Sequence, residues 1–419
     1  MKIIVVGTSN SVMGGKGYIE ALRLEHEVVQ LSSGRTPFYS CMKSILNHKS
    51  EIENSDLLII DHYINDVNFY GARLGDSYRK HLDLFYSYLS SLNVNILNLM
   101  FPIQDLEQRK AIDLYHQTKS LCDKYAISVL DLNEFDMPKE FYSDLIHLTH
   151  DVSYALGLSL NKGFSKFDFE NVDFGSVSNF PFYSLNVSDL PNNRNEIGNF
   201  KNSLISVDYL KLEHELTVHV PEEHELIALG LLTDKTVDGC SGFILNNEEM
   251  GVSGGGYFLE TVEKNVCGNF TISPLLGENE VRNMMGRGVS KGLFSYCYIV
   301  DFFLLDTGKK MECISAKRKQ YRIDISEFSI LAKKFLSMGN KNSDFPKLSP
   351  KSIDRLRDFA LSLEAEDLQV SRDLMLLAHL ARSQGPFIKK KLAEYEKALN
   401  EQSKAKQSKA KQSKLSVAL

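Results

Sequence analysis

The chain has 419 residues, of which 43% are hydrophobic and 24% charged, and its formal net charge is −6. This length and composition predict two or three packed domains and exclude a globally disordered chain. The net charge becomes −11 when the five lysines between residues 402 and 414 are set aside. An acidic body of this kind argues against a nucleic-acid-binding surface.

No stretch of the sequence is long and apolar enough to span a bilayer, and the N-terminus lacks the basic and apolar regions of a signal peptide. We therefore expect a cytoplasmic protein. Its cysteines form no CxxC pair, which argues against a zinc module and a disulfide framework, and we expect reduced thiols in the core. They are Cys41, Cys122, Cys240, Cys267, Cys297 and Cys313.

Residues 1–165 alternate short apolar runs with longer amphipathic ones, a pattern typical of strands joined by helices in a parallel sheet. The apolar runs predict strands at Lys2–Val6, Glu27–Leu31, Asp56–Ile60, Asn95–Met100 and Ile127–Leu130. The amphipathic runs predict helices at Met13–Leu24, Tyr78–Leu92, Asp105–Lys124 and Val152–Leu160. The expected fold of this domain is a three-layer α/β sandwich.

Residues 170–325 have a different sequence pattern, in which Gly, Asn and Ser separate short segments rich in β-branched and aromatic residues. Strands are predicted at Leu216–Val220 and Leu293–Val300, and the run Gly254–Gly256 is predicted to be a loop. These features indicate a β-rich accessory domain, most simply a β-sandwich.

Residues 349–400 are predicted to be helical. Ser349-Pro350 is a good helix start, apolar residues then recur at helical spacing, and a third helix is expected after Gly385-Pro386. The tail 401–419 repeats Gln-Ser-Lys-Ala-Lys and cannot bury a core, so we expect a disordered segment or a frayed helix. The helical region and the tail are candidates for binding a protein partner.

Polar residues stand at the ends of the predicted strands, where an open α/β sheet carries its binding and catalytic residues. A serine nucleophile needs a histidine to accept its proton and a carboxylate to orient that histidine, and Ser9, His147 and Asp144 could supply these groups. The developing oxyanion needs fixed donors, for which the N–H groups of Ser9 and Gly34 and the side chain of Asn65 are suited.

The order of these residues resembles the SGNH (GDSL-like) hydrolase superfamily: a serine after the first strand, a glycine after the second, an asparagine after the third, and Asp-x-x-His near the domain end. The resemblance covers about the first 165 residues. It implies a flavodoxin-like fold, with Ser9 as nucleophile, His147 as base and Asp144 as its partner. It also implies an oxyanion hole formed by Ser9, Gly34 and Asn65.

Two positions depart from the family pattern: Thr8 replaces the usual aspartate, and Tyr63 replaces a glycine two residues before Asn65. Tyr63 favours an alternative hypothesis, in which an inactive SGNH-like domain serves as an interaction or glycan-binding protein.

Cofactor sites find little support in the sequence. The glycines between Gly7 and Gly17 lack the spacing of a dinucleotide or P-loop motif, and no cofactor is expected. Asp144, His147 and His150 stand at three-residue intervals, but no fourth ligand of comparable spacing follows, so no metal is expected either.

The implied reaction has two possible ends. Water could attack the acyl-serine, which makes the protein an esterase, or a sugar hydroxyl could attack, which makes it an O-acyltransferase. An acetyl ester is the expected substrate. The neighbouring β-rich domain favours a large ligand such as a polysaccharide or glycan.

Overall fold

The computed structural model describes residues 1–12, 17–34, 36–167, 172, 175–190, 195–201, 206–233, 240–253, 256–283, 289–344, 350–365, 367–381 and 387–399. The chain divides into two compact units, Met1–Phe335 and Leu336–Leu419. The first unit contains the α/β region and the β-rich region.

The α/β region is built on a five-stranded parallel sheet of order β2-β1-β3-β4-β5. Its strands β3 and β4 are mainly apolar and wholly buried because helices cover both faces, as the sequence predicted. The strands are β1 (Lys2–Gly7), β2 (Glu27–Gln30), β3 (Leu57–Asp61), β4 (Asn95–Met100) and β5 (Ser128–Asp131). This order and direction confirm the predicted flavodoxin-like three-layer fold.

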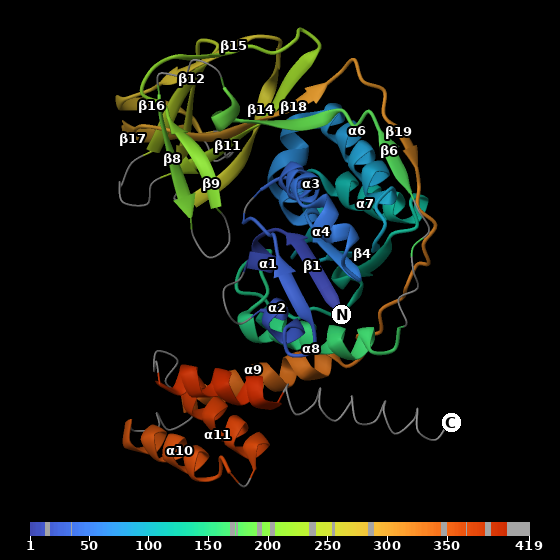
Figure 1. The fold of residues 1–419 in the computed structure, drawn as a ribbon, viewed down its shortest axis with the longest axis vertical. Coiled ribbons are helices and arrows are strands. Elements are labelled where there is room, and N and C mark those ends of the chain that lie inside the picture. Colours follow the sequence, from blue (N-terminus) through green and yellow to red (C-terminus); the bar gives the residue numbers. More distant parts are fainter. Residues whose placement is uncertain are drawn as a thin grey trace, which may run out of the picture. The chain divides into compact units, whose positions relative to one another are not determined.

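Figure 1 shows α2 and α8 together on one side of this sheet and α3, α6 and α7 on the other. Helices α2 and α8 approach closely at Gly157, where an added Cβ would lie 2.3 Å from the carbonyl oxygen of Tyr18. The helices are α1 (Ser9–Val12), α2 (Tyr18–Leu22), α3 (Phe38–Asn47), α4 (Lys49–Glu53), α5 (Tyr63–Asn65), α6 (Gly71–Ser90), α7 (Ile112–Lys124) and α8 (His150–Phe164). Single turns are η1 (Asp66–Tyr70, π), η2 (Leu106–Gln108), η3 (Leu132–Glu134) and η4 (Lys139–Phe141).

Three helix predictions need correction. The segment Met13–Leu24 is not one helix, because α1 ends at Val12 and α2 begins at Tyr18, while residues 13–16 lie outside the described part. Helix α7 begins at Ile112 rather than at Asp105. Helix α6 begins before the predicted Tyr78, and its first part is interrupted at Gly75, whose φ of 63° favours glycine.

The β-rich region forms two six-stranded sheets. One has the order β10-β15-β12-β13-β16-β17; the other has the order β14-β11-β18-β9-β8, with β7 also paired to β18. Both contribute to one apolar core, which includes Phe243 and Ile272 from the first sheet and Leu229 and Phe302 from the second. The region is therefore a β-sandwich, as predicted.

The strands of the sandwich are β7 (Phe182–Asn186), β8 (Glu196–Lys201), β9 (Ser206–Lys211), β10 (Leu216–Val218), β11 (His224–Thr233), β12 (Cys240–Leu245), β13 (Glu248–Ser253), β14 (Gly256–Cys267), β15 (Phe270–Pro274), β16 (Gly277–Asn283), β17 (Val289–Ser295) and β18 (Tyr298–Asp306). The turn η5 (Val187–Asp189) follows β7. A separate pair joins β6 (Ser176–Ser178) to β19 (Glu312–Ile314).

The predicted single strand Leu293–Val300 is wrong, because the chain changes sheets within it. Strand β17 ends at Ser295 in one sheet, and β18 begins at Tyr298 in the other. Cys297, at the corner, is fully buried in the shared core. Of the predicted glycine loop, Gly254 and Gly255 lie outside the described residues and Gly256 begins β14.

The sandwich packs against α3 of the α/β region. The ring of Tyr39 lies 6.0 Å from that of Phe303 on β18, and Lys43, one helical turn later, pairs with Asp301 on the same strand. After β19 the chain returns to the α/β region, where Arg318 donates to carbonyl oxygens at the end of α6. These contacts account for the joining of both regions in one unit.

Helix α9 (Phe328–Asp344) spans the boundary between the two units. The second unit contains α10 (Pro350–Ser362), α11 (Leu368–Ala381) and a helical stretch at 387–399, which share a small apolar core including Ile353, Met375 and Tyr395. The predicted Lys-rich tail lies outside the described residues.

The cysteine prediction is correct for only part of the set. Cys41, Cys122 and Cys297 are buried free thiols, whereas Cys267 is exposed and Cys313 is half-buried; the side chain of Cys240 lies outside the described part. Cys267 is exposed because it ends strand β14. Within the described part of the chain, the helices are all too short or too polar to cross a bilayer.

Candidate active site

Three residues that lie far apart in the sequence form one chain of hydrogen bonds. The Oγ of Ser9 lies 2.6 Å from Nε2 of His147, and Nδ1 of the same ring lies 2.7 Å from Oδ2 of Asp144. When Nδ1–H donates to the carboxylate, Nε2 can accept the serine proton. The structure therefore brings together the three residues that the sequence singled out.

The positions of these residues follow from local structure. Ser9 begins α1 directly after β1 ends at Gly7, so its side chain stands at the carboxyl edge of the sheet. Asp144 shapes the loop that carries His147, because its Oδ1 accepts hydrogen bonds from the N–H groups of Ile146 and His147, both at 2.9 Å.

Asn10 ties the serine turn to the histidine loop. Its Nδ2 donates to the carbonyl oxygen of Ile146 at 2.9 Å, and its Oδ1 accepts from the N–H of Leu148 at 3.3 Å. These bonds hold the chain on both sides of His147. Asn10 was not predicted as a site residue, although its position beside Ser9 was the available signal.

Solvent reaches this site. The side chain of Asp144 is 55% exposed and that of His147 is 26% exposed. Partial burial raises the pKa of Asp144, but hydrogen bonds from the Ile146 N–H and from His147 outweigh it, so the pKa lies below its ordinary value. Asp144 is therefore ionised at neutral pH and can orient the imidazole.

The loop that contains Gly34 is tied to its neighbours at the same sheet edge. The N–H of Ser33 donates to the carbonyl oxygen of Gly7 at 3.0 Å, and Nδ2 of Asn65 donates to the carbonyl oxygen of Thr36 at 3.0 Å. Gly34 itself is half-buried, with open space where a Cβ would lie. These bonds connect the ends of β1 and β3 to the loop after β2.

Comparisons with known proteins find similarity to solved structures over about the first 40% of the chain. One is a lipase/acylhydrolase from Enterococcus faecalis (18% identity, TM-score 0.32), matched over 41% of this chain and 100% of that one. Another is a member of the lipolytic G-D-S-L family from Veillonella parvula (14%, 0.33), matched over 40% and 100%.

A third is a catalytic mutant of an acetylxylan esterase from Geobacillus stearothermophilus (18%, 0.32), matched over 40% of this chain and 94% of that one. No family model and no curated protein matches the sequence.

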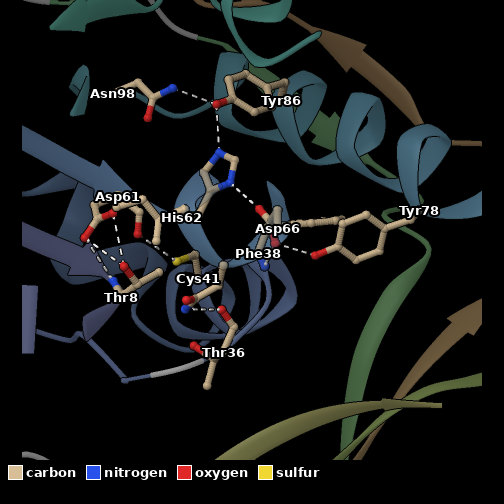
Figure 2. Close-up of polar contacts among 12 residues, drawn as sticks. Thr8, Thr36, Phe38, Cys41, Asp61, His62, Asp66, Tyr78, Tyr86 and Asn98 are labelled. Carbon is tan, nitrogen blue, oxygen red and sulfur yellow. Dashed lines mark hydrogen bonds and ion pairs between the residues drawn. The ribbon is translucent and has the colours of Figure 1, made fainter. Parts of the chain in front are cut away.

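A buried polar network around His62 and Asp66, close to Asn65 in the sequence, fixes the end of β3 (Figure 2). His62 bonds Oδ2 of Asp66 through Nδ1 at 2.7 Å and the hydroxyl of Tyr86 through Nε2 at 2.8 Å. Oδ1 of Asp66 accepts from the N–H of Phe38 at 3.0 Å and from the hydroxyl of Tyr78. The network joins the start of α3, and hence the Gly34 loop, to the helix that carries Asn65.

Asp61 connects the serine turn to the end of β3 (Figure 2). Its carboxylate accepts hydrogen bonds from the N–H of Thr8 at 3.2 Å, the hydroxyl of Thr8 at 3.1 Å and the hydroxyl of Ser11 at 2.9 Å. Burial raises the pKa of Asp61 to about 6, although these hydrogen bonds partly oppose the shift. Thr8 therefore stabilises the turn by donating to the Asp61 carboxylate at the end of β3, which neighbours β1 in the sheet.

Tyr63 is buried away from solvent. Its hydroxyl donates to the carbonyl oxygen of Phe101 and accepts from Nδ2 of Asn133 at 2.7 Å. Burial raises the pKa of this phenol well above its ordinary value, so it stays neutral. The bulky residue at this position is thus accommodated by contacts with the ends of β4 and β5.

His150 is the first residue of α8 and is exposed. In the part of the chain that the structure describes, no three His, Cys, Asp or Glu side chains gather in a way that could hold a metal ion.

Proposed function

We propose that the protein is an SGNH-type serine esterase or O-acyltransferase acting on an acyl ester, with acetyl as the acyl group. The observation that carries this proposal is the hydrogen-bonded chain from Ser9 through His147 to Asp144. A histidine that touches both a serine hydroxyl and a carboxylate is the arrangement that acyl transfer requires.

In the first half of the reaction, Oγ of Ser9 attacks the ester carbonyl carbon while Nε2 of His147 takes the hydroxyl proton. Asp144 stabilises the resulting imidazolium through Nδ1–H. The tetrahedral intermediate collapses, the bond from the carbonyl carbon to the alkoxy oxygen breaks, and the leaving alcohol receives the proton from His147.

In the second half, a water molecule or an acceptor hydroxyl gives its proton to His147 and attacks the acyl-serine. The carbonyl carbon gains a bond to the new oxygen, and Ser9 leaves with the proton returned by the imidazole. Water gives the free acid, and an acceptor hydroxyl gives a new ester.

The oxyanion of each tetrahedral intermediate needs donors at fixed positions. The N–H groups of Ser9 and Gly34 and the amide of Asn65 are our candidates. The Asn65 amide carries a second N–H besides the one given to Thr36, and that first bond holds the amide in place.

The alternative function is a non-catalytic binding protein built on the same fold. Hydrolysis of p-nitrophenyl acetate by the wild type and by Ser9→Ala separates the two. Turnover that disappears in Ser9→Ala supports the enzyme. Equal rates in both proteins, or no turnover by the folded wild type, would favour the binding protein.

Hydrolysis and transfer are separated by mass spectrometry of an oligosaccharide incubated with the protein. Loss of acetyl groups from an acetylated oligosaccharide indicates an esterase. Gain of acetyl groups by a free oligosaccharide in the presence of acetyl-CoA indicates a transferase.

A further inference from the structure

A cavity of about 530 Å³ lies between the α/β region and the sandwich. One wall is α3, which contributes Lys43, Ser44 and Asn47. The opposite wall comes from the sandwich and includes Ser206 and Asp208 on β9. The cavity therefore exists only because the sandwich packs on α3, and its volume is of the size that holds small-molecule ligands.

The lining is rich in neutral groups that both donate and accept hydrogen bonds. Serine and asparagine side chains stand on both walls and on the loop after β2: Ser33, Ser40, Ser44, Asn47, Ser188 and Ser206. Hydroxyl and amide groups of this kind pair with the hydroxyls of a polyol, each of which is also a donor and an acceptor. The apolar part of the lining is aliphatic.

The charges of the lining disfavour an anionic ligand. Lys43 is nearly buried and already paired with Asp301, whose side chain is only 2% exposed. Asp208 adds a second carboxylate, which accepts from Nδ2 of Asn199 at 2.8 Å. The described lining also includes His48, but its carboxylates outnumber its ammonium groups and leave a net negative charge when this imidazole is neutral, so a phosphate or carboxylate ligand would meet net repulsion.

The cavity lining includes a residue of the loop that contacts the candidate active site. Ser33 lines it, and the N–H of the same residue donates to Gly7, two residues before Ser9. Gly34, a candidate oxyanion donor, comes next. A ligand in the cavity thus lies beside the loop after β2, which is hydrogen-bonded to the end of β1 just before the reactive serine.

We propose that this cavity binds a neutral sugar residue, and that it holds the carbohydrate part of the ester whose acyl group reaches Ser9. The placement of the acyl group at Ser9 rests on the proposed function, whereas sugar binding in the cavity does not. The sandwich then acts as one wall of the substrate site.

Ligand-observed saturation-transfer NMR on the full chain tests the binding of a panel of neutral hexoses, pentoses, deoxyhexoses and N-acetylhexosamines. Inorganic phosphate, followed by ³¹P line broadening, is the anionic probe. The blocking variant is Asn47→Trp, at the exposed end of α3. Its matched control is Asn54→Trp, an exposed asparagine at the end of α4 outside the cavity lining.

We expect at least one neutral sugar to bind the wild type and Asn54→Trp, and its Kd, obtained from a saturation-transfer titration, to rise at least about tenfold in Asn47→Trp, a loss of about 1.4 kcal/mol. Phosphate should show no ³¹P line broadening that Asn47→Trp removes. The proposal is overturned if no sugar of the panel binds, if Asn47→Trp binds as the wild type does, or if phosphate occupies the cavity instead.

Turnover measurements test whether the cavity holds the carbohydrate part of the ester substrate. Asn47→Trp should hydrolyse p-nitrophenyl acetate like the wild type, because that ester is too small to need the cavity, but should lose activity on an acetylated oligosaccharide. If Asn47→Trp and the wild type were equally active on the oligosaccharide, the cavity would not hold the carbohydrate part of the substrate. If the protein hydrolyses no ester at all, the proposed function fails while the NMR result still decides sugar binding.

Discussion

The side-chain amide of Asn65 donates a hydrogen bond to the carbonyl oxygen of Thr36 at 3.0 Å. This bond joins the turn after β3 to the loop that carries Gly34. Asn65 can therefore have two roles: one N–H of its amide fixes the loop, and the second N–H can donate to an oxyanion.

We therefore expect Asn65→Ala to lower kcat on p-nitrophenyl acetate by about 10²–10³-fold, or about 2.7–4 kcal/mol, as for loss of one oxyanion donor. The control is Asn68→Ala, which removes a bond to the carbonyl oxygen of Ile64 on the same helical segment. Asn68→Ala should keep wild-type turnover. A rate within about twofold of the wild type for Asn65→Ala would remove this residue from the oxyanion hole.

His147→Ala should reduce kcat by about 10²–10⁴-fold, the usual contribution of a general base. Asp144→Ala should reduce it less, because water can replace a half-exposed carboxylate at Nδ1 of the ring. His150→Ala is the matched control, since this exposed histidine is three residues away and should not affect turnover. Steady-state kinetics in which His150→Ala loses activity and His147→Ala retains it would reverse the assignment.

The Lys43–Asp301 pair is the buried ionic contact between α3 and the sandwich, and breaking it on one side should be costly. Lys43→Met leaves the Asp301 carboxylate buried, so we expect a loss of about 3–5 kcal/mol in the free energy of unfolding. The double variant Lys43→Met, Asp301→Leu should recover most of it.

Urea unfolding followed by circular dichroism measures both changes. Lys49→Met, which breaks only the partly exposed contact with Glu53, should change stability by less than about 0.5 kcal/mol. If Lys43→Met were as mild as Lys49→Met, the buried pair would not hold the two regions together.

The raised pKa of Asp61 makes a pH-dependent contribution to stability. Its pKa is about 6 in the folded protein against an ordinary 3.8, so between these values the folded state holds more protons than the unfolded state. Stability contributed by Asp61 is therefore present below about pH 4 and falls as the pH rises to about 6, by up to about 3 kcal/mol.

Asp61→Asn lacks this titration. The free energy of unfolding of the wild type, measured relative to Asp61→Asn by urea titration, should thus decrease between pH 4 and pH 6 and level off above it. A difference that is constant or that increases over this range would show that Asp61 is not a carboxyl with a raised pKa.

The parallel sheet and the main residues of the site could be predicted because their signals are local. Apolar runs such as Leu57–Ile60 mark strands buried on both faces, and Ser9 and Asn65 follow such runs directly. Asp144 and His147 were found by their spacing.

Other features depend on contacts that no short pattern contains. Helix α3 was missed although its apolar positions recur at helical spacing, and its packing on the sandwich through Tyr39 is a contact that no short pattern contains. Pro37, directly before it, was the available signal. The change of sheet at Cys297 was missed because residues 293–300 are rich in aromatic and β-branched residues and contain neither Gly nor Pro to mark the corner.

The partners of α3 lie far along the chain. Lys43 and Asp301 are 258 residues apart, so the cavity between the two regions could not be located from the sequence. In the same way, the role of Asn10 became visible only when the histidine loop was placed against α1.

The central claim is that Ser9 shares its proton with His147, and labelling with a serine-directed fluorophosphonate tests it most directly. Mass spectrometry of the digested protein should find one adduct, on the peptide containing Ser9. The adduct should be absent from Ser9→Ala and should form much more slowly in His147→Ala. No adduct on the folded wild type, or labelling that is unchanged in Ser9→Ala, would contradict the account.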